Sequence, residues 1–283
     1  MNHSNNFLYH SPCDNCGSRD NKAVYDDGHT YCFGCQQYKK ENGELPKKEK
    51  IVTDMIDGIT EALPSRKIDE ETCKKFNYQT GTYKGEPVHI ANFYDKEHNR
   101  VAQKLRYQDK RFTWLGDADK ITLFGQNIWR DGGKMIVITE GEIDALTVSK
   151  VQNNKYPVVS VPSGATSAKK YIKKELDWLS KFENIVLMFD NDEAGKKASI
   201  ECANILPVKK VKIATLPAKD PSELLQKGKG EQIVSCMWEA KAYTPQGIIS
   251  GNETKDLLLK DDLVESIPYQ WTGFNKKLGG IRK

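Results

Sequence analysis

The sequence predicts a multidomain protein of the α+β class, with a small cysteine-rich module, a mixed α/β segment and a segment built around a parallel sheet. Three observations support this prediction. Four of the seven cysteines lie within the first 35 residues. Two strand-like stretches near residue 100 flank a polar turn, which is typical of an antiparallel hairpin. From residue 134 onward, short apolar runs alternate with amphipathic helical patterns, as in parallel sheets with crossover helices.

The overall composition excludes several functional classes. Hydrophobic residues make up 38% and charged residues 29% of the 283 residues, which is typical of a folded chain rather than a disordered one. The longest apolar runs are far shorter than the roughly 20 residues that span a bilayer, and no secretory signal pattern is present. We therefore expect a cytoplasmic protein that does not act at a membrane. The net charge of +4 is too small to indicate a nucleic-acid partner by itself.

Residues 1–40 form the predicted metal-binding module. They contain two Cys-x-x-Cys motifs, formed by Cys13, Cys16, Cys32 and Cys35. Each motif offers two thiolates from one tight turn, and zinc takes four such ligands in a tetrahedron. The alternative of two redox-active pairs is disfavoured, because neither motif opens a helix after a strand. With strands expected at 23–25 and 30–33, the module is predicted to be a zinc ribbon holding one structural Zn²⁺.

The turn between the two expected ribbon strands allows two interpretations. Asp27 and His29 lie beside Tyr25 and Tyr31, and such side chains can read base edges and stack on bases. Base recognition by Asp27 and His29 is one interpretation of this pattern, and the residues alone do not favour it. In the alternative, Tyr25, Tyr31 and Phe33 pack around the cysteines, and His29 is a solvated turn residue.

The next two segments differ sharply in pattern. Residues 41–52 are charged, contain glycine and proline and lack apolar periodicity, so they are predicted to be a linker. Residues 53–133 are predicted to form the mixed α/β part, with a helix at 69–76 and an antiparallel hairpin of strands 88–94 and 101–107.

The expected hairpin carries a concentration of positive charge. Six cations lie between residues 96 and 111, namely Lys96, Arg100, Lys104, Arg106, Lys110 and Arg111. Lys104 and Arg106 are two residues apart on one strand and therefore point to the same face. Phe112 and Trp114 follow closely, and cations beside aromatic rings suit a single strand or a triphosphate. The alternative is a solvated face of the hairpin.

Residues 134–243 are predicted to form the parallel-sheet part. Strands are expected at 135–139, 158–162, 184–189 and 211–217, and helices at 142–152, 167–182 and 193–206. Such sheets have right-handed crossovers, and their functional groups gather at the carboxyl ends of the strands.

Carboxylates follow three of these four strands. They are Glu140, Asp190, Asp192 and Asp220. Clustered carboxylates raise one another's pKa unless a cation neutralises them, and hard oxygen ligands suit Mg²⁺. The sequence therefore predicts a magnesium site at this edge. The alternative for any single acidic residue that follows a strand is that it caps the N-terminus of a helix. This alternative applies first to Asp144 and Glu193.

The acidic motifs and the order of parts resemble a known family. Glu-Gly at 140–141 and Asp-x-Asp at 190–192 resemble the Toprim fold of topoisomerases and primases. A zinc ribbon, a linker, a mixed segment and a Toprim sheet in this order resemble the primase half of the T-odd bacteriophage primase–helicase family. The motifs that carry the resemblance, between residues 7 and 240, are PCDNCGS, DDGHTYC, GEIDALTV, KYPVVS, MFDNDEAGKKA and LPAKD. The loop at 161–165 departs from the family, which has a Gly-His-Gly type loop there, so a histidine role is not expected.

The resemblance implies a DNA-dependent RNA primase, a nucleotidyltransferase that joins ribonucleoside triphosphates on a single-stranded DNA template. It also implies that the primer passes to a DNA polymerase, and that the site of action is the cytoplasm of a phage-infected host cell. The 3′-hydroxyl of the growing primer would attack the α-phosphate of the incoming triphosphate, and pyrophosphate would leave.

The resemblance also implies roles for individual residues. The ligands of one or two Mg²⁺ would be Asp190, Asp192 and Asp220, with Asp144 as a further candidate. Glu140 would be another ligand or the proton acceptor. The contacts to nucleotide or template would be Lys104, Arg106 and Lys110. The template recognition sequence would be read by Asp27 and His29.

Residues 244–283 are predicted to contain a linker helix at 253–264 and then an irregular tail. The segment 271–280 is similar to the start of the family's RecA-like helicase domain. The chain contains no Gly-x-x-x-x-Gly-Lys-Ser/Thr motif, so no ATP-hydrolysing site is predicted in it. The helicase domain of the same parent chain is an expected partner.

A protein of another class remains an alternative at this point. A non-catalytic zinc-finger Toprim protein, such as a recombination mediator that clamps DNA, would share the ribbon and the sheet. It would not need the basic hairpin or all three acidic motifs. A type IA topoisomerase and a hydrolytic Toprim nuclease are weaker alternatives.

Overall fold

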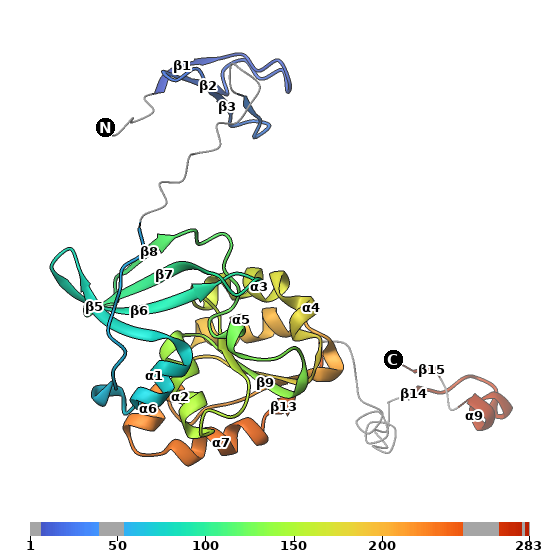
Figure 1. The fold of residues 1–283 in the computed structure, drawn as a ribbon. Coiled ribbons are helices and arrows are strands. Elements are labelled where there is room, and N and C mark those ends of the chain that lie inside the picture. The colour runs from blue at the N-terminus through green and yellow to red at the C-terminus, as the bar shows by residue number, and fades with distance from the viewer. Residues whose placement is uncertain (1–6, 40–53, 246–265, 279–280, 283) are drawn as a thin grey trace. The chain divides into compact units, whose positions relative to one another are not determined.

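The computed structural model describes residues 7–39, 54–245, 266–278 and 281–282. The chain divides into two compact units, Met1–Thr53 and Asp54–Lys283, which are described separately (Figure 1). The linker predicted at 41–52 and the helix predicted at 253–264 lie outside the described residues. The finer division into five parts stays a prediction.

The N-terminal unit is a small antiparallel sheet with the order β1-β2-β3-β4. Its strands are β1 (Phe7–Ser11), β2 (Lys22–Tyr25), β3 (Thr30–Cys32) and β4 (Tyr38–Lys39). The central pair β2–β3 confirms the two predicted strands. The outer strands were not predicted, because β1 is almost wholly exposed and has no apolar alternation, and β4 has only 2 residues.

The larger unit begins with α1 (Glu70–Phe76) and an antiparallel sheet of order β5-β6-β7-β8. The strands are β5 (Tyr78–Tyr83), β6 (Glu86–Tyr94), β7 (Arg100–Tyr107) and β8 (Phe112–Gly116). Asp69 caps α1 by accepting from the backbone N–H of Thr72 at 2.9 Å, so the predicted helix is confirmed. The predicted hairpin is also confirmed as β6–β7, but it is the centre of a four-stranded sheet. Two short 3₁₀ turns, η1 (Pro64–Arg66) and η2 (Gln126–Ile128), flank this part.

The second sheet has the order β10-β9-β11-β12-β13, in which the first four strands are parallel and β13 is antiparallel. Its strands are β9 (Gly133–Thr139), β10 (Val158–Ser160), β11 (Phe182–Met188), β12 (Val211–Ile213) and β13 (Lys241–Ala242). The helices are α2 (Glu142–Val151), α3 (Ala165–Lys174), α4 (Leu176–Leu179), α5 (Glu193–Ala203), α6 (Pro221–Gln226) and α7 (Gly230–Trp238), with the 3₁₀ turn η3 (Val208–Lys210). The predicted parallel sheet is confirmed, whereas α6, α7 and β13 were not predicted.

One predicted helix is wrong in its extent. The helix expected at 167–182 is divided into α3 and α4, and Phe182 is already the first residue of β11. The break falls at Glu175, whose ψ of 19° leaves the helical range. Its carboxylate is buried and accepts a hydrogen bond from Gln126 Nε2 at 3.0 Å. This anchoring of Glu175 outside the helix explains why the helical pattern does not continue.

The core follows the alternation of the parallel strands. Val137 and Val186 face one apolar cluster, which includes Phe76 of α1 and Leu146 of α2. Ile136, on the other face of β9, belongs to a second cluster with residues of α3, α4 and α5. Helices therefore cover both faces of the sheet, as Figure 1 shows. Within the described residues, no helix has the length and apolarity needed to cross a membrane.

The described C-terminal residues form two short strands with a helix between them. These elements are β14 (Ser266–Ile267), α9 (Thr272–Leu278) and β15 (Ile281–Arg282), and the two strands are antiparallel. The tail is therefore not irregular as predicted. The assignment of 271–280 to the start of a helicase domain stays a prediction.

Candidate active site

The four predicted zinc ligands lie together in the N-terminal unit. Their Sγ atoms are all within 4.8 Å of one another, with Cys13 and Cys35 at 3.7 Å and Cys16 and Cys32 at 3.6 Å. A zinc ion bound to four thiolates at about 2.3 Å would require sulfur–sulfur edges of about 3.8 Å. Backbone N–H groups, first that of Cys35, lower the pKa of Cys32 to about 6, which favours its thiolate form. The arrangement therefore fits a tetrahedral metal ion.

The predicted recognition residues lie side by side in the same unit, but His29 is not exposed. The residue is 8% exposed, and its ring is stacked on Tyr25 with 4.1 Å between ring centroids and also stacks on Tyr38. Its Nδ1 is hydrogen-bonded to the exposed carboxylate of Asp27. The alternative is wrong for His29, which is not solvated, and Phe33 is 59% exposed, whereas Tyr25 and Tyr31 are half-buried. Base recognition by Asp27 and His29 stays a prediction.

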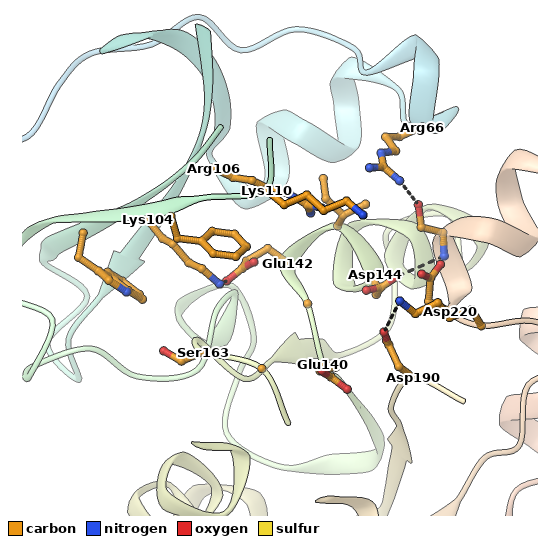
Figure 2. A pocket seen from close by; sticks show the side chains of 17 residues that line it. Arg66, Lys104, Arg106, Lys110, Glu140, Glu142, Asp144, Ser163, Asp190 and Asp220 are labelled. Atoms are coloured by element: carbon orange, nitrogen blue, oxygen red, sulfur yellow. Dashed lines mark hydrogen bonds and ion pairs between the residues drawn. The ribbon is translucent and has the colours of Figure 1, made fainter. Parts of the chain in front are cut away.

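In the larger unit, the acidic and basic residues predicted from separate segments line one cavity of about 470 Å³ (Figure 2). The predicted carboxylates lie at the carboxyl ends of the parallel strands and in the helix that follows β9, and they are Glu140, Asp144, Asp190 and Asp220. Glu142 also lines the cavity. The predicted cations come from β7 and the turn after it, and they are Lys104, Arg106 and Lys110. The antiparallel sheet thus supplies positive charge to the acidic edge of the parallel sheet.

Asp192 does not line this cavity. It is exposed, and its Oδ1 accepts from the backbone N–H of Gly195 at 2.9 Å, which caps α5. Asp220 has both properties, because it caps α6 through the N–H of Glu223 at 2.7 Å and still lines the cavity. The N-cap interpretation of Asp144 and Glu193 is wrong, since the caps of α2 and α5 are Gly141 and Asp192.

Crowding of carboxylates changes their acidity. Burial, together with the charges of Glu140 and Asp220, raises the pKa of Asp190 to about 7, and the ammonium of Lys219 at 4.0 Å opposes this shift. Burial, with the charges of Asp220 and Asp190, also raises the pKa of Asp144 well above its ordinary value. Without a cation, the cavity therefore holds protons near neutral pH that it would give up to a metal ion.

The backbone of the loop at 161–165 forms hydrogen bonds with side chains on two sides of the cavity. The backbone N–H of Ala165 donates to Glu140 Oε1 at 3.1 Å, whereas Glu140 Oε2 is buried and has no hydrogen-bond partner in the described part of the chain. On the other side, Lys104 Nζ donates to the carbonyl oxygen of Pro162 at 2.8 Å. The unpartnered oxygen of Glu140 and the raised pKa of Asp190 both fit a bound divalent cation.

Lys104 is not a solvated residue of the hairpin, as the alternative interpretation would have it. It is 8% exposed, and its Nζ forms a 2.8 Å ion pair with Glu142, which is also buried. The ammonium lies 4.5 Å from the ring centroid of Phe112, and Arg106 lies over the same ring at 5.9 Å. The prediction that Lys104 and Arg106 share a face is confirmed. The alternative of a solvated face is wrong for Lys104, whereas Lys110 and Arg111 are exposed.

Several cavity residues carried no assigned role in the sequence. Arg66 lies in η1, which has no periodic pattern, and donates to Ser222 Oγ at 3.4 Å. Ser222 in turn donates its backbone N–H to Asp144 Oδ1 at 3.2 Å. Lys219 precedes Asp220 in the LPAKD motif, so its position was the available signal for it.

Comparisons with known proteins show the family to which the chain belongs. Residues 58–116 match the family model "Bacteriophage T7 DNA helicase/primase, N-terminal a+b fold", and residues 137–225 match the model "Toprim-like". A crystal structure of the primase fragment of the bacteriophage T7 primase–helicase is 41% identical, with a TM-score of 0.64. The match covers 82% of this chain and 100% of that fragment. The chain belongs to this phage primase–helicase family.

Two further relatives agree with membership in the primase portion of this family. Primase domains of the bacteriophage T7 protein, in a structure with the lagging-strand DNA polymerase, an RNA/DNA hybrid and dTTP, match with 44% identity and a TM-score of 0.63. That match covers 66% of this chain and 94% of the other. The DNA helicase/primase of Enterobacteria phage T3 is 37% identical over 98% of this chain. The chain spans 52% of the length of that curated relative.

In this primase family member, the two matched segments are the two sides of the cavity. The T7-type match contains the basic strand β7, and the Toprim-like match contains all five cavity carboxylates, including Glu142. The similarity to the T7 primase fragment covers most of the chain rather than the Toprim segment alone. The recombination-mediator alternative is therefore set aside.

Proposed function

We propose that the chain synthesises short oligoribonucleotide primers on a single-stranded DNA template. The observation that carries this proposal is the cavity in which carboxylates of the parallel sheet face cations of the antiparallel sheet. A site for nucleotidyl transfer needs both, because the reaction handles a highly anionic triphosphate and also needs a divalent cation.

The proposed cation is Mg²⁺, held by Glu140, Asp190 and Asp220, with Asp144 as a further candidate. These residues offer hard oxygen ligands, and the buried, unpartnered Oε2 of Glu140 supports a role for that carboxylate. When bound, Mg²⁺ would stabilise negative charge on the reacting phosphates. A role for Asp192 as a ligand would require its carboxylate to leave the cap of α5.

The chain's own residues would bind and orient the reactants. Arg106 and Lys110 lie in the cavity without an ion-pair partner among the described residues, so they are the candidates to bind phosphates of nucleotide or template. Lys104 is already paired with Glu142, and we assign it to holding β7 against α2 beside the reactive edge. Glu140 Oε2 is the candidate atom for either predicted role of this residue, which is a metal ligand or the proton acceptor.

The N-terminal unit would bind one structural Zn²⁺ and read the template. The geometry of the four sulfur atoms supports zinc, and the exposed aromatic rings of the ribbon support contact with bases. Further proposed partners are a DNA polymerase that receives the primer and the helicase domain of the parent protein. The proposed place of action is the cytoplasm of a phage-infected cell.

The test is a primer-synthesis assay with zinc-loaded protein, a single-stranded DNA template, labelled ribonucleoside triphosphates and Mg²⁺. We expect short labelled oligoribonucleotides that require both the template and the metal ion. The variant Lys209→Ala is a matched control, because this exposed cation lies on η3 outside the cavity. Absence of ribonucleotide products from folded, zinc-loaded protein would overturn the proposal.

A further inference from the structure

A second cavity, of about 1010 Å³, lies at the opposite end of the parallel sheet from the acidic cavity. Its lining includes Gly133 at the start of β9, Pro157 just before β10, Val151 at the end of α2 and Trp238 at the end of α7. We call it the amino-edge groove, because it lies at the amino ends of the strands. Since β9 has 7 residues, the two edges are about 20 Å apart.

The amino-edge groove is lined by positive charge without negative charge. Arg130, Lys134 and Lys155 contribute to the lining, all three are exposed, and the lining contains no carboxylate. Across the described ranges, none of the three forms an ion pair. An anion is therefore the ligand that complements the charge of this groove.

The same groove presents aromatic rings to solvent. Tyr156 is 59% exposed and Trp238 is 70% exposed, and both belong to the lining. The apolar side chain of Met237 lies beside them in the lining and is almost fully buried. Exposed rings among unpaired cations are the combination on which single-stranded nucleic acids bind, since the rings stack with bases and the cations contact phosphates.

A buried acceptor in the lining also lacks a partner. Gln152 is 6% exposed, and its Nε2 donates to the carbonyl oxygen of Val148 at 3.2 Å. Its Oε1 is buried and accepts no hydrogen bond from any described residue. Buried acceptors are normally satisfied, and an amino group or ring N–H of a base is a donor of suitable kind.

We propose that the amino-edge groove binds single-stranded nucleic acid, with Trp238 and Tyr156 as stacking residues and Lys134 and Lys155 as phosphate contacts. Its volume is at the upper end of the roughly 300–1,000 Å³ of pockets for small ligands, which favours several nucleotides of a strand over one free nucleotide. The groove would hold a part of the strand that is remote from the acidic cavity. This binding role goes beyond primer synthesis and does not depend on it.

Photocrosslinking tests the location directly. Zinc-loaded protein is irradiated with a 20-nucleotide DNA strand that carries 4-thiothymidine, and crosslinked peptides are identified by mass spectrometry. We expect crosslinks in 153–157 and 234–238, and we expect Trp238→Ala to reduce those in 153–157 at least 5-fold. Primer synthesis on a short template should be unchanged in Trp238→Ala, because this residue lies outside the acidic cavity.

The salt dependence of binding tests the charges. In fluorescence anisotropy with the same strand, loss of two phosphate contacts in the double variant Lys134→Ala/Lys155→Ala should reduce the slope of log K against log salt by about 1.4. Lys209→Ala and Ile200→Ala, which change an exposed cation and an exposed apolar residue elsewhere, should bind as the unchanged protein does.

Three results would overturn the proposal. They are the absence of crosslinks in both segments, unchanged affinity and salt slope in the Lys134/Lys155 double variant, and full suppression of these crosslinks by free dTTP. The last result would assign the groove to a free nucleotide. Failure of primer synthesis with crosslinks intact would remove the proposed function and leave this groove in place.

Discussion

Asp190 lies just after β11 and lines a cavity with Glu140, Asp144 and Asp220. A carboxyl group with a pKa near 7 is protonated at pH 5 in the folded chain, although the same group in an unfolded chain is ionised there. The folded state therefore binds more protons than the unfolded state between about pH 4 and pH 7. In this range, Asp190 makes the free energy of unfolding fall as the pH rises.

This pH dependence of the free energy of unfolding predicts the effect of Asp190→Asn on stability. In zinc-loaded protein without Mg²⁺, the variant should be more stable than the unchanged chain at pH 8, by up to about 4 kcal/mol. The gain should be smaller at pH 5, where Asp190 already carries a proton. Urea unfolding followed by tryptophan fluorescence at the two pH values measures this, and equal gains at both would contradict the assigned pKa.

The buried pair of Lys104 and Glu142 gives a second prediction. Glu142→Gln removes the negative charge that compensates the buried ammonium of Lys104, so it should cost about 3 kcal/mol of stability. The double variant Lys104→Met/Glu142→Gln should recover part of this loss, because no charge is then left unpaired.

Urea unfolding of the single and double variants provides the measurement. Arg106→Met is the matched control, since Arg106 is on the same strand and is only partly buried. Single variants that change stability by less than about 0.5 kcal/mol would show that the pair is not a structural contact.

Single residues were predictable where the topology decides their position. Glu140 and Asp190 were found because the carboxyl ends of parallel strands meet at one edge. The pairing of Lys104 with Glu142 joins residues 38 positions apart and leaves no periodic signal. Arg66 was also missed, because it lies in a 3₁₀ turn of 3 residues, which is too short to leave a periodic signal. Asp192 was predicted from its position after β11, and its carboxylate caps the N-terminus of α5.

At the scale of elements, the junction between β11 and α5 holds the reactive edge in place. Gly195, in the first turn of α5, passes so close to the loop that an added Cβ would lie 2.1 Å from the carbonyl oxygen of Asp190. No side chain fits there unless the backbone of Asp190 shifts. Glycine at 195 is therefore required by the close approach of the helix to the loop.

Gly195→Ala should thus reduce primer synthesis about 10- to 100-fold by displacing Asp190, while the far-ultraviolet circular dichroism stays close to that of the unchanged protein. Gly273→Ala is the control, because nothing lies within 4 Å of an added Cβ there. Full activity of folded Gly195→Ala would contradict a fixed position of Asp190 in the reaction.

Elements with strong local patterns were predicted, and short elements were not. The strands β9 and β11 and the helix α2 have clear apolar periods and were found. The strand β13 has 2 exposed residues, and its pairing with β12 comes from distant parts of the chain. The break between α3 and α4 depends on Gln126, which is 49 residues from Glu175. Tertiary contacts therefore decided the elements that local patterns left out.

At the scale of the whole molecule, two units with apolar cores of very different size are joined in one chain. The N-terminal unit has few buried apolar residues, among them Ala23 and two of the cysteines, whereas two large apolar clusters support the Toprim sheet. Metal binding in such a small module supplies about 10–16 kcal/mol, most of its folding free energy. The family match and the order of these units were predictable from motif order, but the amino-edge groove was not, because it gathers residues from three separate segments.

Removal of zinc should therefore unfold one unit and spare the other. After chelation, amide hydrogen exchange in 7–39 should become fast, while protection in 54–245 should persist. Re-addition of Zn²⁺ should restore protection in 7–39. Simultaneous loss of protection in both ranges would contradict independent stability of the larger unit.

The central claim is that the carboxylates of the Toprim sheet and the cations of β7 form one site for nucleotidyl transfer. The most direct test is the initial rate of template-directed dinucleotide synthesis by Asp190→Ala, compared with Lys209→Ala at saturating Mg²⁺. The account predicts a loss of at least about 100-fold for Asp190→Ala and an unchanged rate for Lys209→Ala. A folded Asp190→Ala variant that makes dinucleotides within about 3-fold of the unchanged rate would contradict it.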